Sequence, residues 1–218
     1  NIDLMHGLPG QQTGSALEDI RSAIEYVPEH ISWYQLTIER NTAFYKSPPE
    51  LPDEDQLWSI YRQGQKLLTE KGYQQYEVSA YARDSHLSVH NLNYWKSGGY
   101  LCIGSGAHGK ITLPGHQGIR RSQKTRLPAD YINGNANQPT SGVIIEHHEL
   151  IAEFMMNALR LNSGFTADLF EQRTGLDFAL LLEPIENAAA KGLLRSGKHI
   201  RATEKGWLFL DDLVSCFL

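Results

Sequence analysis

Asn1-Ile2-Asp3-Leu4-Met5-His6-Gly7-Leu8-Pro9-Gly10 opens the chain with a short apolar run that ends in a turn rich in glycine and proline. The run predicts a strand over 2–5. A helix is predicted over 15–27, because apolar residues recur there at helical spacing before Pro28. A second strand follows over 31–36. This strand–helix–strand order is the unit from which parallel sheets are built.

The same order is repeated further along the chain. A helix is predicted over 53–72, with Asp53 and Gln56 at capping positions, and strands are predicted over 75–80 and 100–103. We therefore expect an α/β fold with parallel strand pairing. In such folds ligands bind at the carboxyl ends of the strands, where this chain is polar or rich in glycine.

The character of the sequence changes after about residue 141. Short helices are predicted over 146–161, 166–173 and 178–191. A hairpin around Ser196-Gly197-Lys198 and a closing helix over 204–217 follow, an order that is typical of a winged-helix-like domain. We expect two domains, 1–135 and 141–218, with a boundary in the polar segment between them.

The composition excludes several classes of protein. The chain has 218 residues, of which 41% are hydrophobic, and a net charge of −5, which argues against a nucleic-acid partner. No apolar run reaches the roughly 18 residues of a membrane span, although peripheral membrane association stays open. Two distant cysteines, Cys102 and Cys216, indicate a cytoplasmic protein. Because the chain opens inside a predicted strand and without Met, we expect a fragment that lacks its N-terminal part.

A glycine-rich motif follows the strand predicted over 100–103. Gly104-Ser105-Gly106-Ala107-His108-Gly109 matches the G-x-G-x-x-G pattern of dinucleotide-binding loops, which must be followed by a helix. Here the β-branched pair Ile111-Thr112 follows instead, which argues against a nicotinamide cofactor. Two interpretations stay open: a strand end where a ligand approaches the backbone closely, and a structural turn.

Asp3 is a second candidate, since a carboxylate inside an apolar strand costs desolvation unless it is paired. It could accept both hydrogen bonds of a ribose diol, or it could be satisfied by backbone amides. The basic segment 120–126 could hold carboxylates or phosphates, or be a solvated surface. His147-His148-Glu149 lacks the spacing of a zinc-binding pair and is interpreted as solvated.

The loop His90-Asn91-Leu92-Asn93-Tyr94-Trp95 is the most informative stretch for function, because binding groups gather on loops. His90 could be an axial metal ligand, with Tyr94 and Trp95 stacking on a flat macrocycle. A hydrogen-bonded structural histidine is the alternative interpretation. His86 and His108 are competing candidates for the ligand.

Six blocks in order resemble the radical S-adenosylmethionine (SAM) family of coproporphyrinogen III oxidase-like proteins, and among them its heme chaperones. The blocks are 1–10, 33–39, 76–82, 90–95, 103–110 and, in the C-terminal part, 154–161 with 173–176. Four of them are similar to barrel strands five to eight of that family. The block 90–95 has the H-N-x-x-Y-W motif that is associated with heme binding.

The resemblance implies the C-terminal half of a radical SAM (β/α) barrel over 1–135 and a helical, winged-helix-like domain over 141–218. It also implies which residues bind. The SAM site would comprise Asp3, Met5, Gln35, Gly104, Gly106 and Ala107. His90 would be the heme-iron ligand, with Tyr94 and Trp95 shaping the heme site. That the segment 120–126 faces the heme propionates is our own hypothesis.

The chain also departs from the family pattern. The C-x-x-x-C-x-x-C loop that holds a [4Fe–4S] cluster is absent, so we expect its ligands in the missing N-terminal part and no radical chemistry from this fragment alone. Ser88 and Val89 stand where many relatives have a cysteine before the His-Asn pair, which argues against a second ligand beside His90.

Two functions are therefore expected in order of preference. The first is a heme chaperone that passes heme to an apo-hemoprotein acceptor, with SAM bound in the intact protein. The alternative is an oxygen-independent coproporphyrinogen III oxidase, which would oxidatively decarboxylate propionate side chains in porphyrin biosynthesis. The H-N-x-x-Y-W motif favours the chaperone, since the oxidase does not require it.

Overall fold

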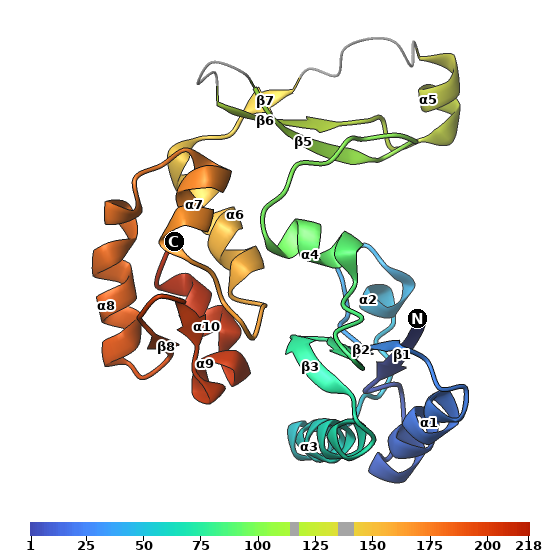
Figure 1. Ribbon diagram of the computed structural model, residues 1–218. Coiled ribbons are helices and arrows are strands. Elements are labelled where there is room, and N and C mark those ends of the chain that lie inside the picture. Colours follow the sequence, from blue (N-terminus) through green and yellow to red (C-terminus); the bar gives the residue numbers. More distant parts are fainter. Residues whose placement is uncertain (114–117, 135–141) are drawn as a thin grey trace. The chain divides into compact units, whose positions relative to one another are not determined.

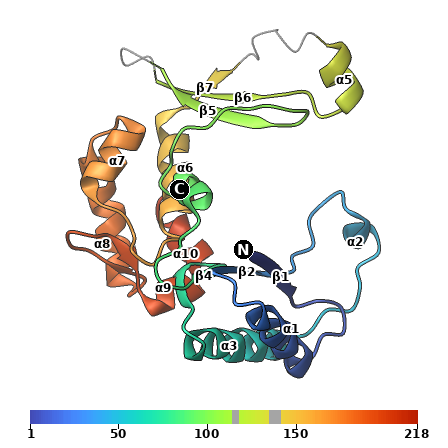
Figure 2. The same cartoon turned by 45° about the vertical axis from the view of Figure 1, so that its right-hand side comes forward.

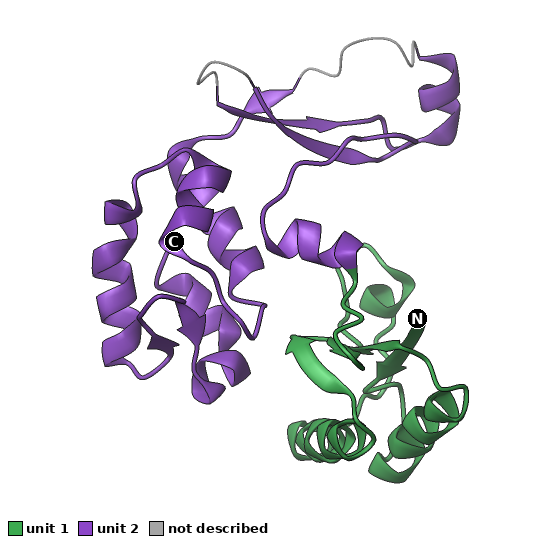
Figure 3. Cartoon of the chain, viewed as in Figure 1, with its two compact units in different colours: residues 1–88 green, residues 89–218 purple. Residues whose placement is uncertain are grey.

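The computed structural model describes residues 1–113, 118–134 and 142–218. The chain divides into two compact units, Asn1–Ser88 and Val89–Leu218 (Figure 3). The boundary predicted between 135 and 141 lies outside the described residues. The domains 1–135 and 141–218 therefore stay a prediction.

The first unit is a mixed sheet with helices on one face. Its strands are β1 (Ile2–His6), β2 (His30–Gln35), β3 (Gln74–Glu77) and β4 (Ala80–Ala82), in the spatial order β1-β2-β4-β3. Its helices are α1 (Thr13–Glu25), α2 (Ala43–Lys46) and α3 (Glu54–Glu70). The helices α1 and α3 pack side by side under the sheet (Figure 1 and Figure 2). The pairing of β1 with β2 is parallel, as predicted, with Ile2 opposite Ile31 and His6 opposite Gln35.

The third predicted strand, 75–80, is wrong in both extent and direction. The segment forms β3 and β4, which pair with each other antiparallel, and β4 pairs antiparallel with β2. The buried Glu77 accepts a hydrogen bond from the backbone N–H of Ser79 at 3.0 Å and so stabilises the reversal between the two strands. An apolar pattern does not reveal such a turn, because the turn depends on a local side-chain to backbone bond.

The helix ends follow capping chemistry. Asp53 caps α3 as predicted, since its Oδ1 accepts from the backbone N–H of Gln56 at 2.8 Å. The start predicted for α1 is wrong by two residues: Gln12 is the N-cap, and Ser15 occupies the third helical position of the capping box. Ser15 therefore closes the box from inside the helix and does not begin it.

Trp33 joins the sheet to the helices of the first unit. It lies on β2, is 3% exposed, and packs against the backbone of Gly64 in α3. A Cβ at Gly64 would lie 2.0 Å from Cη2 of Trp33, so only glycine allows this approach. The surrounding core contains Ala16, Ile20, Ile31, Ile60, Leu68, Tyr73 and Tyr81.

His6 is buried beside the same tryptophan, at the end of β1. It is 3% exposed, and its ring centroid lies 4.1 Å from that of Trp33. Among the described residues, its Nδ1 has no hydrogen-bond partner. Burial disfavours the charged imidazolium and lowers the pKa of His6 to about 4.

The second unit begins with α4 (Val89–Trp95) and contains an antiparallel sheet of β5 (His108–Thr112), β6 (Ile119–Gln123) and β7 (Val143–Ile144), with α5 (Pro128–Asn133) beyond it (Figure 1). The strand predicted over 100–103 is wrong. Only Tyr100 pairs there, in an isolated antiparallel bridge to Lys110. The strand that the resemblance assigned to 103–110 therefore begins only at His108, and it pairs antiparallel with β6.

The C-terminal segment has the predicted order of helices and a hairpin. Its elements are α6 (His147–Ala158), α7 (Ala167–Thr174), η1 (Phe178–Leu181), α8 (Leu182–Ala190), β8 (Leu194–Arg195), β9 (Arg201–Ala202), α9 (Glu204–Leu208) and α10 (Leu210–Ser215). Phe154 packs edge-to-face on Phe165 and Phe170, with centroids 5.0 and 5.1 Å apart, at the centre of the core. None of the helices in the described parts of the chain has both the length and the apolar character of a membrane span.

We expect Gly64→Ala to lower the free energy of unfolding by about 1–3 kcal/mol, because a methyl group there overpacks the core against Trp33. The matched control is Gly14→Ala in α1, where a Cβ would meet nothing within 4 Å. That change should stabilise the chain by up to about 1 kcal/mol through helix propensity. Urea denaturation measures both, and equal stability of the two variants would contradict the packing.

The buried His6 predicts a loss of stability in acid. Between pH 6.5 and about 4 the unfolded chain binds a proton that the folded chain does not, so stability falls as the pH falls. The loss should reach roughly 3 kcal/mol at the lower limit. The variant His6→Leu should lose less stability between neutral pH and about pH 4.5 than the wild type, while His86→Leu, at an exposed histidine, should follow the wild type. Identical pH profiles for all three chains would refute the assignment to His6.

Candidate functional site

The segment predicted as the His90 loop is a helix, α4, and this changes how its residues are presented. His90 and Tyr94 are four residues apart and share one helix face. Their ring centroids lie 4.9 Å apart in an edge-on arrangement, and Tyr94 packs in turn on Tyr100 at 4.8 Å. The helix forms because 89–95 contains no glycine or proline, and it ends at Ser97-Gly98-Gly99, where the φ of Ser97 is 51°.

The neighbouring face of α4 packs against the rest of the second unit. Asn91 and Trp95 are also four residues apart, and α4 packs against α6 in the second unit. The guanidinium of Arg160 lies over the ring of Trp95, 4.3 Å from its centroid. One face of the indole is therefore occupied by the protein itself, and the role of Trp95 as a heme contact stays a prediction.

His90 is exposed on this helix. Within the described parts of the chain, neither of its ring nitrogens has a hydrogen-bond partner. Of the other two candidate ligands, His86 has its Nδ1 3.1 Å from the carbonyl oxygen of Arg83 and its Nε2 4.0 Å from Oε1 of Glu29. His108 is exposed at the start of β5. His90 therefore combines an accessible imidazole with an aromatic support.

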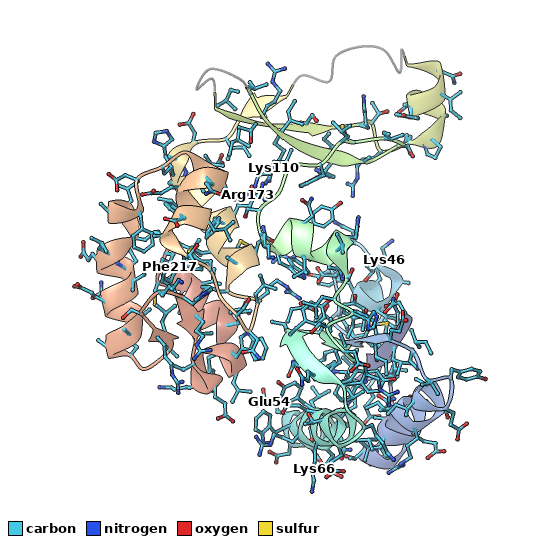
Figure 4. The ribbon with its side chains drawn as sticks, viewed as in Figure 1. Lys46, Glu54, Lys66, Lys110, Arg173 and Phe217 are labelled. Carbon is cyan, nitrogen blue, oxygen red and sulfur yellow. The ribbon has the colours of Figure 1, made fainter. Side chains whose placement is uncertain are left out.

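A partly buried ion-pair cluster lies between the β5–β6 pair and α6. Lys110 and Arg121 are directly opposite each other on β5 and β6, so their side chains share one face of the sheet. Both bind Glu153 of α6: Lys110 Nζ lies 3.1 Å from Oε1, and Arg121 contacts Oε2. The side chain of Lys110 is only 5% exposed. Figure 4 labels this residue. Sequence reasoning missed this cluster, because its members are far apart in the chain.

Tyr100 connects this cluster to the aromatic pair on α4. Its backbone N–H donates to the carbonyl oxygen of Lys110 at 2.8 Å and its carbonyl accepts from the Lys110 N–H at 2.9 Å. Burial raises the pKa of the Tyr100 phenol, and the negative charge of Glu153 raises it further. Tyr100 is therefore neutral at physiological pH and close to Glu153.

Three residues of the predicted SAM site lie in the first unit, on the parallel strand pair: Asp3 near the start of β1, Met5 near its end, and Gln35 at the end of β2. All three are exposed. Alternation along β1 explains the exposure of Asp3 and Met5, because their side chains point away from the helices that cover Leu4 and His6. Of the two interpretations left open for Asp3, the structure does not favour satisfaction by backbone amides, because Asp3 is exposed and accepts a hydrogen bond from the Asn1 side chain.

The carboxylate of Asp3 is stabilised as an anion. A hydrogen bond from the Asn1 side chain at 2.9 Å is the main cause of a lowered pKa, and Ser32 contributes a further bond. An exposed, ionised carboxylate can accept hydrogen bonds from a ligand.

The other three predicted SAM residues lie in the second unit, in a tight turn before β5. Gly104 and Gly106 have φ values of +100° and +72°, which favour glycine. The N–H of Gly106 donates to the carbonyl of Thr125 at 2.6 Å, and that of Ala107 donates to Gly104 at 3.3 Å. A strand follows Gly109, where a dinucleotide fingerprint needs a helix. That these residues and Asp3 form one site stays a prediction.

The predicted basic segment is divided by the structure. Residues 119–123 form β6, and Arg121 is committed to Glu153. The side chains of Arg120 and Arg126 are exposed. The hypothesis that this segment faces heme propionates therefore applies only to residues other than Arg121.

The cysteines do not fit an iron–sulfur cluster of the family type. Such a cluster needs three thiolates, whereas the chain has two cysteines. Cys102 Sγ lies 3.3 Å from Ser122 Oγ, and Cys216 packs near Lys191. Within the described residues, no group of three or more His, Cys, Asp or Glu side chains could hold a metal ion.

Comparison with known proteins gives consistent results. Residues 145–209 match the family described as the HemN C-terminal domain. Proteins named heme chaperone HemW from Haemophilus influenzae and Escherichia coli are each 47% identical over 100% of this chain, which covers 56% and 57% of their lengths. A solved structure of coproporphyrinogen III oxidase (HemN) from Escherichia coli, described as a radical SAM enzyme, matches with a TM-score of 0.75 at 22% identity, over 100% of this chain and 54% of its own.

These matches confirm the resemblance that the sequence blocks predicted. The structural match also confirms the fold class, an α/β architecture that corresponds to the C-terminal part of the radical SAM fold. The chain spans little more than half the length of the curated relatives it matches.

Proposed function

We propose that this chain, which resembles the C-terminal part of the radical SAM coproporphyrinogen III oxidase-like family, binds heme through His90 as part of a heme chaperone. One observation carries the proposal. The imidazole of His90 is exposed, is supported edge-on by Tyr94, and has no hydrogen-bond partner among the described residues. Similarity over the whole of this chain to part of proteins named heme chaperone supports the same function.

The geometry suits a cargo that must be released. A neutral imidazole nitrogen can coordinate heme iron, and the edge contact with Tyr94 restricts how the ring turns. The position on an exposed helix face leaves heme accessible to an acceptor. A ligand from an apo-hemoprotein could therefore replace His90 by exchange at the iron.

The nucleoside of SAM is proposed to contact the exposed carboxylate of Asp3, with Met5 and Gln35 as further contacts from the first unit. Gly104, Gly106 and Ala107 are proposed as SAM contacts from the second unit. The ionised state of Asp3 supports its proposed contact, because a carboxylate can accept both hydroxyl hydrogens of a ribose diol. The [4Fe–4S] cluster would be held by cysteines in the part of such proteins that this chain does not cover. A cytoplasmic location and an apo-hemoprotein acceptor are parts of the same proposal.

The oxidase alternative gains support from the fold alone, since the structural match to HemN is at 22% identity. A protein that contains both this chain and a cluster-binding part distinguishes the two. Incubated with coproporphyrinogen, SAM and a reductant, an oxidase would form protoporphyrinogen. A chaperone would return the substrate unchanged.

The proposal is tested by titrating heme into this chain and following the Soret absorption band. We expect saturable one-to-one binding by the wild type and at least a roughly tenfold weaker affinity for His90→Ala. His86→Ala and His108→Ala are matched controls, because both histidines are exposed, and they should bind like the wild type.

Equal binding by the wild type and His90→Ala would refute the role of His90. Loss of binding in His86→Ala or His108→Ala alone would transfer the ligand role to that residue. Far-ultraviolet circular dichroism of every variant establishes that a loss of binding does not come from unfolding.

A further inference from the structure

The ion-pair cluster and the His90 helix belong to one continuous set of contacts within the second unit. Glu153 binds Lys110, Lys110 is bridged to Tyr100 by two backbone hydrogen bonds, and Tyr100 packs on Tyr94, which supports His90. We propose that Glu153 is a positioning residue for His90: through Lys110 and Tyr100 it holds α4 in the orientation that presents the imidazole. The inference rests on the proposed heme-binding function of His90.

Glu153 occupies the position from which these contacts start. It lies on α6, inside the segment that matches the HemN C-terminal domain. Its side chain is 18% exposed and contacts both Lys110 and Arg121, so its negative charge offsets the repulsion between two like charges that face each other across the sheet. Removing this carboxylate would leave the buried ammonium of Lys110 uncompensated.

The helix α4 is attached to the rest of the second unit by side-chain contacts. The contacts of this seven-residue helix include Trp95 under Arg160 and Tyr94 against Tyr100. Asn93 also donates to the carbonyl oxygen of Gly99, just beyond the end of the helix. Arg160 contacts α4 directly, whereas Glu153 on α6 is connected to it only through Lys110 and Tyr100. A helix this short is marginal without tertiary contacts.

The two contacts fix different parts of α4. The Arg160 contact fixes the end of α4 that carries Trp95, whereas the Tyr94–Tyr100 contact fixes the face that carries His90. Only the second contact depends on Lys110, through the paired backbone bonds at Tyr100. Loss of the Lys110–Glu153 pair should therefore loosen the His90 face and leave the core around Phe154 intact.

The test uses this chain with three substitutions. Glu153→Gln removes the charge. Lys110→Met removes the ion pair with Glu153 and leaves the backbone bonds to Tyr100 in place. Arg121 still compensates Glu153, so this variant should fold even if Glu153→Gln does not. Glu186→Gln on α8 is the matched control, because Glu186 is exposed.

The first measurement is hydrogen exchange without heme, which does not depend on the proposed function. We expect amides of 89–97 to exchange roughly tenfold faster in Glu153→Gln and Lys110→Met, with exchange in α6, α7 and α8 unchanged. The Glu186→Gln chain should match the wild type. Unchanged exchange over 89–97, or faster exchange throughout the C-terminal helices, would overturn the inference.

The second measurement is the heme titration of the same variants beside His90→Ala. We expect a roughly tenfold weaker affinity and a shifted Soret band in Glu153→Gln and Lys110→Met. If His90→Ala binds like the wild type, the proposed function fails, whatever the other variants do. If His90→Ala loses binding but Lys110→Met keeps the wild-type affinity and spectrum, only the positioning role of Glu153 fails.

Discussion

The carboxylate of Glu153 is the contact on which the second unit depends. Two cations face each other across β5 and β6, and this arrangement is tolerable only with a negative charge between them. The only group that supplies it among the described residues lies on α6, more than thirty positions later in the sequence. The pairing therefore connects the sheet, the C-terminal helices and, through Tyr100, the helix that carries His90. A buried pair of this kind gives little net stability, but it fixes one arrangement of the elements that it joins.

The H-N-x-x-Y-W motif gains its meaning from the helix that it forms. Spacing of four residues places His90 with Tyr94 on one face and Asn91 with Trp95 on the next. The first face supports an exposed imidazole, while the second packs against α6 beneath Arg160. The motif thus combines the proposed binding role of His90 with a structural role of Trp95, and its two aromatic residues serve different faces of the helix. Only one of them, Tyr94, touches the histidine.

The first unit divides its residues between two faces in the same way. Along β1, the side chains of Leu4 and His6 are directed to the helices, whereas Asp3 and Met5 are exposed on the opposite face. The tight contact between Trp33 and Gly64 fixes the distance from the sheet to α3. A well-packed layer behind the strands keeps the exposed carboxylate of Asp3 in a defined position, as a nucleoside site would require.

The sequence by itself determined the elements that depend on local chemistry. These include the parallel pair β1–β2, the Asp53 cap and the order of the C-terminal helices. The family resemblance was equally readable, because its motifs are contiguous. Tertiary structure alone decided the antiparallel β3–β4 hairpin, the helical state of 89–95, the exposure of Asp3 and the association of Lys110, Arg121 and Glu153. The physical reason is range: propensities, caps and periodicity act within a few residues, whereas strand direction, burial and ion pairing depend on partners that only folding brings together.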